Sequence, residues 1–136
     1  MPEHVGERRI LLVEDEKVIA DTLGKILSSN GYDTRVAYSA EAAMAALSLW
    51  SPHLAILDVM LPNMNGIELA VALKERFDRC HVLLFSGQPA AEGLMQKARS
   101  EGHEFEILAK PIHPTTMLDT ISNLLCPSNA ERAHGL

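Results

Sequence analysis

The sequence has few of the features that mark secreted, membrane or zinc-binding proteins. Only two of its 136 residues are cysteines, and Cys80 and Cys126 lie far apart with no CxxC pair, so neither a disulfide framework nor a zinc site is indicated. No apolar run approaches the roughly 20 residues that span a bilayer, and no apolar segment of signal-peptide length follows the charges near the amino terminus. We therefore expect a cytoplasmic protein without a membrane span.

Basic residues are fewer than acidic ones. Twelve Lys and Arg against 18 Asp and Glu give a formal net charge of −6. Nucleic-acid binding normally needs a basic face, so we expect no direct nucleic-acid partner. The sequence also contains neither GxGxxG after a strand nor a GxxxxGKS or GxxxxGKT loop, and the common nucleotide-binding loops are therefore excluded.

Apolar runs of strand length alternate with segments of helical periodicity. The clearest runs are continuous, as is typical of parallel strands covered on both faces by helices. The expected strands are Ile10 to Val13, Tyr32 to Ala37, Leu54 to Leu57, Val82 to Phe85 and Glu106 to Ala109. Five β/α units in a row predict an α/β fold with a parallel five-stranded sheet and helices on both faces.

The expected helices follow from apolar residues at helical spacing. The positions are Val18, Ile19, Thr22, Leu23, Ile26 and Leu27 in the first helix; Ala43, Met44 and Leu47 in the second, after an N-cap at Ser39; Leu69 to Phe77 within the third; Ala91, Leu94, Met95 and Ala98 in the fourth; and Met117, Leu118, Ile121, Leu124 and Leu125 in the fifth.

The residues that follow the apolar runs carry the chemistry, because ligands of open parallel sheets bind outside the carboxyl ends of the strands. These residues are Glu14 and Asp15 after the first run, Asp58 after the third, Ser86 after the fourth and Lys110 after the fifth. Three crowded carboxylates repel unless a cation compensates them. Mg²⁺ prefers such oxygen ligands, and a metal plus a lysine around one carboxylate is an arrangement that stabilises a phosphoryl group in transfer.

Each of these residues also has a purely structural interpretation. Asp15 or Ser86 alone fits a helix cap, Asp58 fits a loop acid, and Lys110 fits a simple ion-pair partner. The occurrence of all of them at separate strand ends favours the functional interpretation, with Asp58 as the nucleophile.

Four stretches together resemble the receiver domain of two-component response regulators, over about residues 8 to 126. They are Ile10 to Glu16, Asp58 to Gly66, Leu83 to Gly87, and Leu108 to Pro111. The resemblance implies a (βα)₅ doubly wound, flavodoxin-like and CheY-like fold with strand order 2-1-3-4-5. Residues 1–7 and 127–136 would then be flexible termini.

The resemblance also implies roles for individual residues. Asp58 would accept a phosphoryl group from a sensor histidine kinase or a histidine phosphotransfer protein, and a downstream output protein or domain would respond. Glu14, Asp15, Asp58 and the backbone carbonyl of Met60 would hold Mg²⁺. Ser86 would be the phosphate-sensing hydroxyl and Lys110 the phosphate partner, in a Lys110-Pro111 pair with a cis bond. At most a weak autophosphatase activity is implied, so we do not expect an enzyme.

The sequence departs from the receiver pattern at one position that matters for signalling. Ile107 stands three residues before Lys110, where receivers usually carry a Tyr or Phe, which predicts weaker coupling between Asp58 and the output surface. The main enzymatic alternative is a phosphatase of the haloacid-dehalogenase type with Asp-x-Asp after its first strand. Here Asp58 follows the third strand and precedes Val59 and Met60, so that general acid is missing.

Overall fold

A computed structural model describes residues 8–87, 91–102 and 105–125, in which strands and helices alternate along the chain. The elements are β1 (Arg9–Val13), α1 (Lys17–Ser29), β2 (Asp33–Ala37), α2 (Ala40–Leu47), β3 (Leu54–Asp58), α3 (Gly66–Arg76), β4 (His81–Ser86), α4 (Ala91–Ser100), β5 (Glu106–Ala109) and α5 (Pro114–Leu125). The expected flexible termini, 1–7 and 127–136, lie outside the described residues.

The five strands form one parallel sheet in the order β2-β1-β3-β4-β5, which confirms the predicted α/β fold and strand order. The pairing aligns the carboxyl ends of neighbouring strands: Val13 pairs with Leu57, Asp58 with Phe85, and Ser86 with Ala109. The loops that follow β1, β3, β4 and β5 therefore leave the sheet at one edge.

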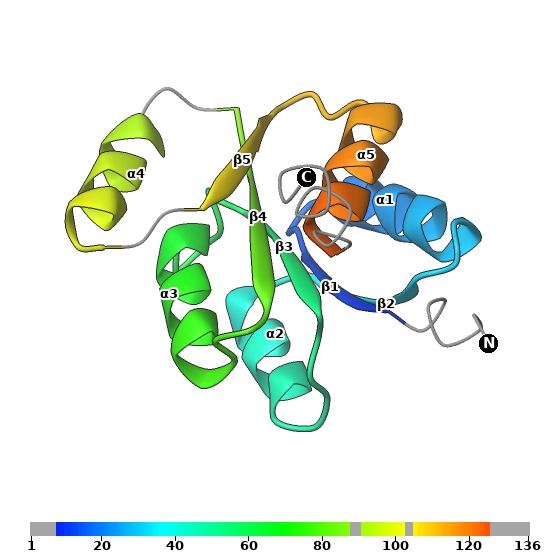
Figure 1. Cartoon of the computed structure of the whole chain (residues 1–136), viewed down its shortest axis with the longest axis horizontal. Coiled ribbons are helices and arrows are strands. Elements are labelled where there is room, and N and C mark those ends of the chain that lie inside the picture. Colours follow the sequence, from blue (N-terminus) through cyan, green and yellow to red (C-terminus); the bar gives the residue numbers. More distant parts are fainter. Residues whose placement is uncertain (1–7, 88–90, 103–104, 126–136) are drawn as a thin grey trace, which may run out of the picture.

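Helices cover the sheet on both faces (Figure 1). One apolar cluster joins the sheet to α2, α3 and Ala98 of α4, and a second joins the opposite face to α1 and α5. All five residues of β3 are buried, whereas the edge strand β5 is mostly exposed and the edge strand β2 alternates between exposed and half-buried residues before its buried last residue. This difference explains why the central strands show as continuous apolar runs in the sequence.

Helix α1 forms where expected, and most of its predicted stripe packs on the sheet: Leu23 and Leu27 are buried and Ile19 and Ile26 are half-buried, but two predicted positions are not. Val18 is 80% exposed and Thr22 is also exposed, whereas Ala20 and Gly24 are buried. A Cβ added at Gly24 would lie 2.8 Å from Val36 Cγ2, so α1 approaches β2 through its smallest side chains. The prediction that Val18 and Thr22 are buried was wrong. It followed the larger side chains at helical spacing, whereas the close approach of α1 to β2 requires a small residue such as Gly24.

The other helices agree with the sequence in outline. Ser39 caps α2 by accepting a hydrogen bond from the Ala42 N–H, and Met117, Ile121 and Leu125 are buried on α5. Phe77 was expected within α3 but follows its last residue, with a φ of −133° outside the helical region. In α4 Ala98 is buried, while the side chains of Ala91, Leu94 and Met95 lie outside the described part of the chain.

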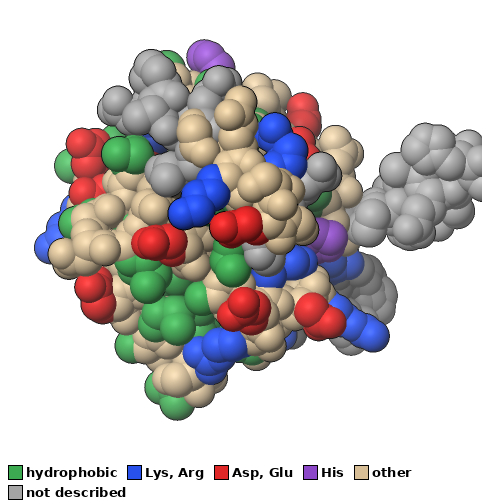
Figure 2. Space-filling model, turned by 90° about the vertical axis from the view of Figure 1, so that its left-hand side faces the viewer, with side chains coloured by type: hydrophobic (Ala, Val, Ile, Leu, Met, Phe, Trp, Pro, Cys, Tyr) green, Lys and Arg blue, Asp and Glu red, His purple; other side chains and the backbone are tan. Residues whose placement is uncertain are grey.

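The surface that carries α4 mixes charges of both signs with apolar side chains (Figure 2). In the described ranges, no helix is long and apolar enough to cross a membrane.

Cys80 is buried, and burial raises the pKa of its thiol to about 12, so the thiol stays protonated at neutral pH. Cys126 lies outside the described residues.

Candidate functional site

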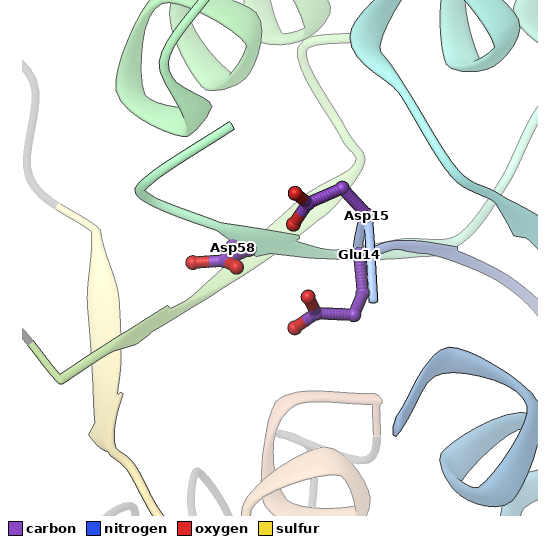
Figure 3. A group of neighbouring side chains, drawn as sticks. All are labelled: Glu14, Asp15 and Asp58. Atoms are coloured by element: carbon purple, nitrogen blue, oxygen red, sulfur yellow. The ribbon is translucent and has the colours of Figure 1, made fainter. Parts of the chain in front are cut away.

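Three carboxylates gather at the carboxyl edge of the sheet (Figure 3). Glu14 and Asp15 directly follow β1, and Asp58 is the last residue of β3, the strand next to β1. Each of these side chains offers an oxygen within 4.8 Å of the oxygens from the other two. The structure thus brings together the three acids that the sequence predicted.

Two of these acids are buried. Glu14 is 0% exposed and Asp58 is 4% exposed, whereas Asp15 is exposed. Each buried carboxylate accepts a hydrogen bond from the backbone N–H two residues later: the Glu16 N–H donates to Glu14 Oε2 and the Met60 N–H to Asp58 Oδ1, both at 3.0 Å. These local hydrogen bonds fix the orientation of both carboxylates.

Lys110 supplies positive charge to both buried acids. Its Nζ lies 2.9 Å from Asp58 Oδ2 and 3.2 Å from Glu14 Oε1. Burial lowers the pKa of Lys110, but the hydrogen bonds and charges of Asp58 and Glu14 outweigh this effect and raise that pKa above its ordinary value. The side chain is therefore an ammonium at neutral pH and part of the same cluster.

Burial and a neighbouring carboxylate shift the pKa of Glu14. Burial raises the pKa of its carboxyl above the ordinary value, and the negative charge of Asp58 raises it further; the hydrogen bond from Glu16 and the nearby Lys110 act in the opposite direction. The net shift is upward, so burial and the charge of Asp58 together outweigh the Glu16 hydrogen bond and the Lys110 ammonium.

The raised pKa of Glu14 predicts a pH dependence of stability in EDTA. Between the ordinary value of 4.5 and the higher folded pKa, Glu14 binds more protons in the folded chain than in the unfolded chain, so its contribution to stability falls as pH rises through this window. Glu14→Gln has no titrating group at position 14. As pH rises above 4.5, its free energy of unfolding should therefore increase relative to that of the wild type. Urea unfolding of both proteins across pH checks this, and a relative gain by the wild type would contradict it.

The residues present fit a hard divalent cation. The three carboxylates line a pocket of about 370 Å³ whose walls also include Glu16, Ile19, Met60, Gly87 and Lys110. Carboxylate and carbonyl oxygens are the ligands that Mg²⁺ prefers, and it keeps several waters, which the exposed side of the pocket at Asp15 can admit. The chemistry of this donor set therefore agrees with the expected Mg²⁺ site.

The loop after Asp58 is held by its own backbone. The Val59 N–H donates to the Phe85 carbonyl and the Gly66 N–H to the Val59 carbonyl. Asn65 and Glu68 form a capping box at the start of α3. A Cβ added at Gly66 would clash with the Asp58 carbonyl oxygen, so only glycine fits beside the backbone of Asp58.

Gly66→Ala is therefore expected to destabilise the fold by about 3 kcal/mol, because backbone rather than a flexible side chain must move. Gly93→Ala is the matched control: a Cβ there meets nothing within 4 Å, and alanine in an open helical position should stabilise by about 0.5–1 kcal/mol. Urea denaturation of both variants measures the two effects. Equal changes in the two variants would show that the close approach at Gly66 has no energetic weight.

The structure places the remaining predicted residues as follows. Ser86 ends β4, and its carbonyl accepts a hydrogen bond from the Lys110 N–H. Met60 lines the pocket, and the Lys110-Pro111 bond is cis. The sequence did not identify Glu16 or Ile19 as pocket residues. Glu16 contacts Glu14 through its backbone N–H, which any residue type provides, and the spacing of Ile19 is that of an ordinary core position of α1.

Comparisons with known proteins agree on one family. The family model described as response regulator receiver domain matches residues 10–122. Response regulator protein FleR of Pseudomonas aeruginosa is 29% identical over 84% of this chain and 24% of its own length. The regulator of RpoS of Escherichia coli (strain K12) is 36% identical over 82% of this chain and 33% of its own length. The chain therefore spans a third or less of the length of these two relatives.

A solved structure shows the same fold. The crystal structure of a CheY-like response regulator receiver domain protein from Methanospirillum hungatei JF-1 has a TM-score of 0.81 to this chain at 27% identity. The match covers 91% of this chain and 98% of that one.

Proposed function

Because the chain belongs to the response regulator receiver domain family of two-component signal transduction, we propose that Asp58 is its phosphoryl acceptor. The single observation that carries this proposal is the position of Asp58. It is a buried carboxylate at the carboxyl end of a central strand, with the Lys110 ammonium 2.9 Å from one of its oxygens. Accepting a phosphoryl group is the general role of this family.

The proposed donor is a phosphohistidine on a sensor histidine kinase or histidine phosphotransfer protein. An Asp58 carboxylate oxygen attacks the phosphorus atom, the P–N bond breaks, and its electron pair stays on the imidazole nitrogen. The product is an acyl phosphate on Asp58. The Met60 N–H, which donates to Asp58 Oδ1, orients the carboxylate for this attack.

The surrounding residues stabilise the charge that develops on the phosphoryl oxygens. Glu14, Asp15, Asp58 and the Met60 carbonyl would hold Mg²⁺, which when bound supplies positive charge against those oxygens. Lys110 offers a second positive charge, and the Ser86 hydroxyl donates to another phosphoryl oxygen. The convergence of three acids and a lysine on one pocket supports these assignments.

The proposed domain comprises residues 8–126, and its phosphorylation changes a surface that a downstream output protein or domain contacts. The role is that of a signalling switch in the cytoplasm, with at most a weak autophosphatase activity. The two relatives are three or more times as long as the matched region. An output domain elsewhere in the same polypeptide is therefore one form that the downstream partner can take.

Intact mass spectrometry after incubation with acetyl phosphate and Mg²⁺ tests the proposal. We expect a single phosphoryl adduct, and we expect excess EDTA to prevent it. A folded, Mg²⁺-binding protein that gained no adduct would instead indicate a receiver that acts by binding alone.

A further inference from the structure

The outer edge of β2 carries backbone groups that no strand in the described part of the chain pairs with. β2 lies at one edge of the sheet, next to β1 (Figure 1). The Asp33 N–H and the Ala37 carbonyl both form their hydrogen bonds on the β1 side. Because alternate residues of a strand face opposite neighbours, Thr34 and Val36 direct their N–H and C=O groups toward the free edge.

The side chains of β2 alternate between the two faces of the sheet. Those of Thr34 and Val36 face α1, and a groove of about 490 Å³ lies between them and that helix. Asp33 and Arg35 lie on the other face, where the Arg35 guanidinium is 4.8 Å from the centre of the Trp50 ring. Both are exposed, and neither forms an ion pair within the described ranges.

An antiparallel pair of β2 strands from two copies of the chain has only a few possible registers, because only outward-facing residues can exchange hydrogen bonds. A two-fold axis at Arg35 would place the two Arg35 side chains directly opposite each other, which is destabilising. An axis at Val36 would place Arg35 opposite the buried Ala37. An axis at Thr34 places Asp33 of each copy directly opposite Arg35 of the other.

This last register makes the edge complementary to itself. Charged residues on an edge strand usually prevent pairing with other chains, but here the two charges have opposite signs and are two residues apart. Symmetry about Thr34 therefore turns them into two cross-strand ion pairs, between strands whose Cα atoms are about 4.5 Å apart at such positions. The two Thr34 residues exchange backbone hydrogen bonds, and their side chains form a favourable cross-strand pair.

We propose that the β2 edge is an interface at which two copies of the chain join their sheets into one, through antiparallel pairing about Thr34. The groove beside α1 gives room for the Thr34 and Val36 side chains of the second copy. Because few residues of each strand take part, we expect a weak dimer. The inference goes beyond the proposed function and does not depend on Asp58, which lies in a separate pocket.

The first test is sedimentation velocity of the unphosphorylated protein in EDTA at increasing concentration. We expect the wild type to change from monomer to dimer as its concentration rises to about 1 mM. Arg35→Asp and Asp33→Arg each turn two attractive pairs into repulsive ones, so each should raise the dissociation constant at least about tenfold. Arg79→Asp, at an exposed position between α3 and β4, makes the same change in net charge and should dimerise like the wild type.

Mixing the two edge variants is the sharper test. When one chain carries Arg35→Asp and the other carries Asp33→Arg, every cross-strand contact again joins an acid to a base. The mixture should therefore form dimers at concentrations where each variant alone is a monomer. A wild type that stays monomeric at about 1 mM, edge variants that dimerise like the wild type, or a mixture that fails to associate would each overturn the proposal.

A further measurement needs no variant and covers the case in which an edge variant does not fold. Amide hydrogen exchange of the wild type is compared at low and high protein concentration. The Thr34 N–H should exchange more slowly at high concentration, because the second copy then protects it. The Arg35 N–H faces β1 and serves as the control within the same strand. Dimers that leave the exchange of Thr34 unchanged would show that the copies meet at another surface.

Discussion

Phosphoryl uptake is expected to be lost entirely when Asp58 is replaced by Asn. The amide keeps the shape of the side chain and can still accept the hydrogen bond from the Met60 N–H, but its oxygen and nitrogen are poor nucleophiles. The fold should persist, because the residue stays polar and hydrogen-bonded. Intact mass after acetyl phosphate and Mg²⁺ should therefore show no adduct on a protein with native circular dichroism.

The matched control for this change is Asp119→Asn, at an exposed position of α5. It makes the same chemical substitution at a residue that does not line the pocket of Asp58, and its phosphoryl uptake should equal that of the wild type. An adduct of unchanged yield on Asp58→Asn would show that another residue accepts the phosphoryl group.

Replacement of Lys110 by Met is expected to have the second largest effect. It leaves Glu14 and Asp58 buried without their shared cation. In EDTA we expect a loss of about 2–3 kcal/mol of stability, less than for a fully buried ion pair, because 28% of the Lys110 side chain is exposed. Phosphoryl uptake at saturating Mg²⁺ should fall by about 10²-fold, the usual effect of removing one group that stabilises transition-state charge.

Urea denaturation and intact mass measure the two effects of Lys110→Met. Mg²⁺ should restore part of the lost stability, since a cation bound only by the folded state stabilises it and relieves the same repulsion. Lys97→Met, at an exposed position of α4, is the control and should change neither quantity. Normal uptake by Lys110→Met would remove Lys110 from the proposed mechanism.

The site could be predicted from the sequence because a parallel sheet converts chain order into spatial proximity. Residues directly after apolar runs must meet at one edge, so Glu14, Asp58 and Lys110 could be placed together without coordinates. The contact between Lys110 and Glu14 could not be predicted, because it depends on side-chain reach across the two strands between β1 and β5. The same holds for the close approach of Gly66 to the Asp58 carbonyl.

The rotation of α1 differs from the predicted one at Val18 and Thr22. Val18 was assigned to the buried stripe of α1 from its apolar side chain, yet α1 contacts β2 through Gly24. Periodicity detects a helix reliably but fixes its rotation only when the contacts involve large side chains. Ile107 is 41% exposed on β5, and its weaker coupling to Asp58 stays a prediction because it concerns a change between two states.

The most direct test of the central claim is to identify the residue that carries the phosphoryl group. Borohydride reduces an aspartyl phosphate to homoserine, which marks the modified position permanently for peptide mass spectrometry. After treatment with acetyl phosphate and Mg²⁺, we predict homoserine at position 58 and nowhere else. Homoserine at position 15, or a phosphoryl adduct that borohydride does not convert at position 58, would contradict the assignment of Asp58 as acceptor.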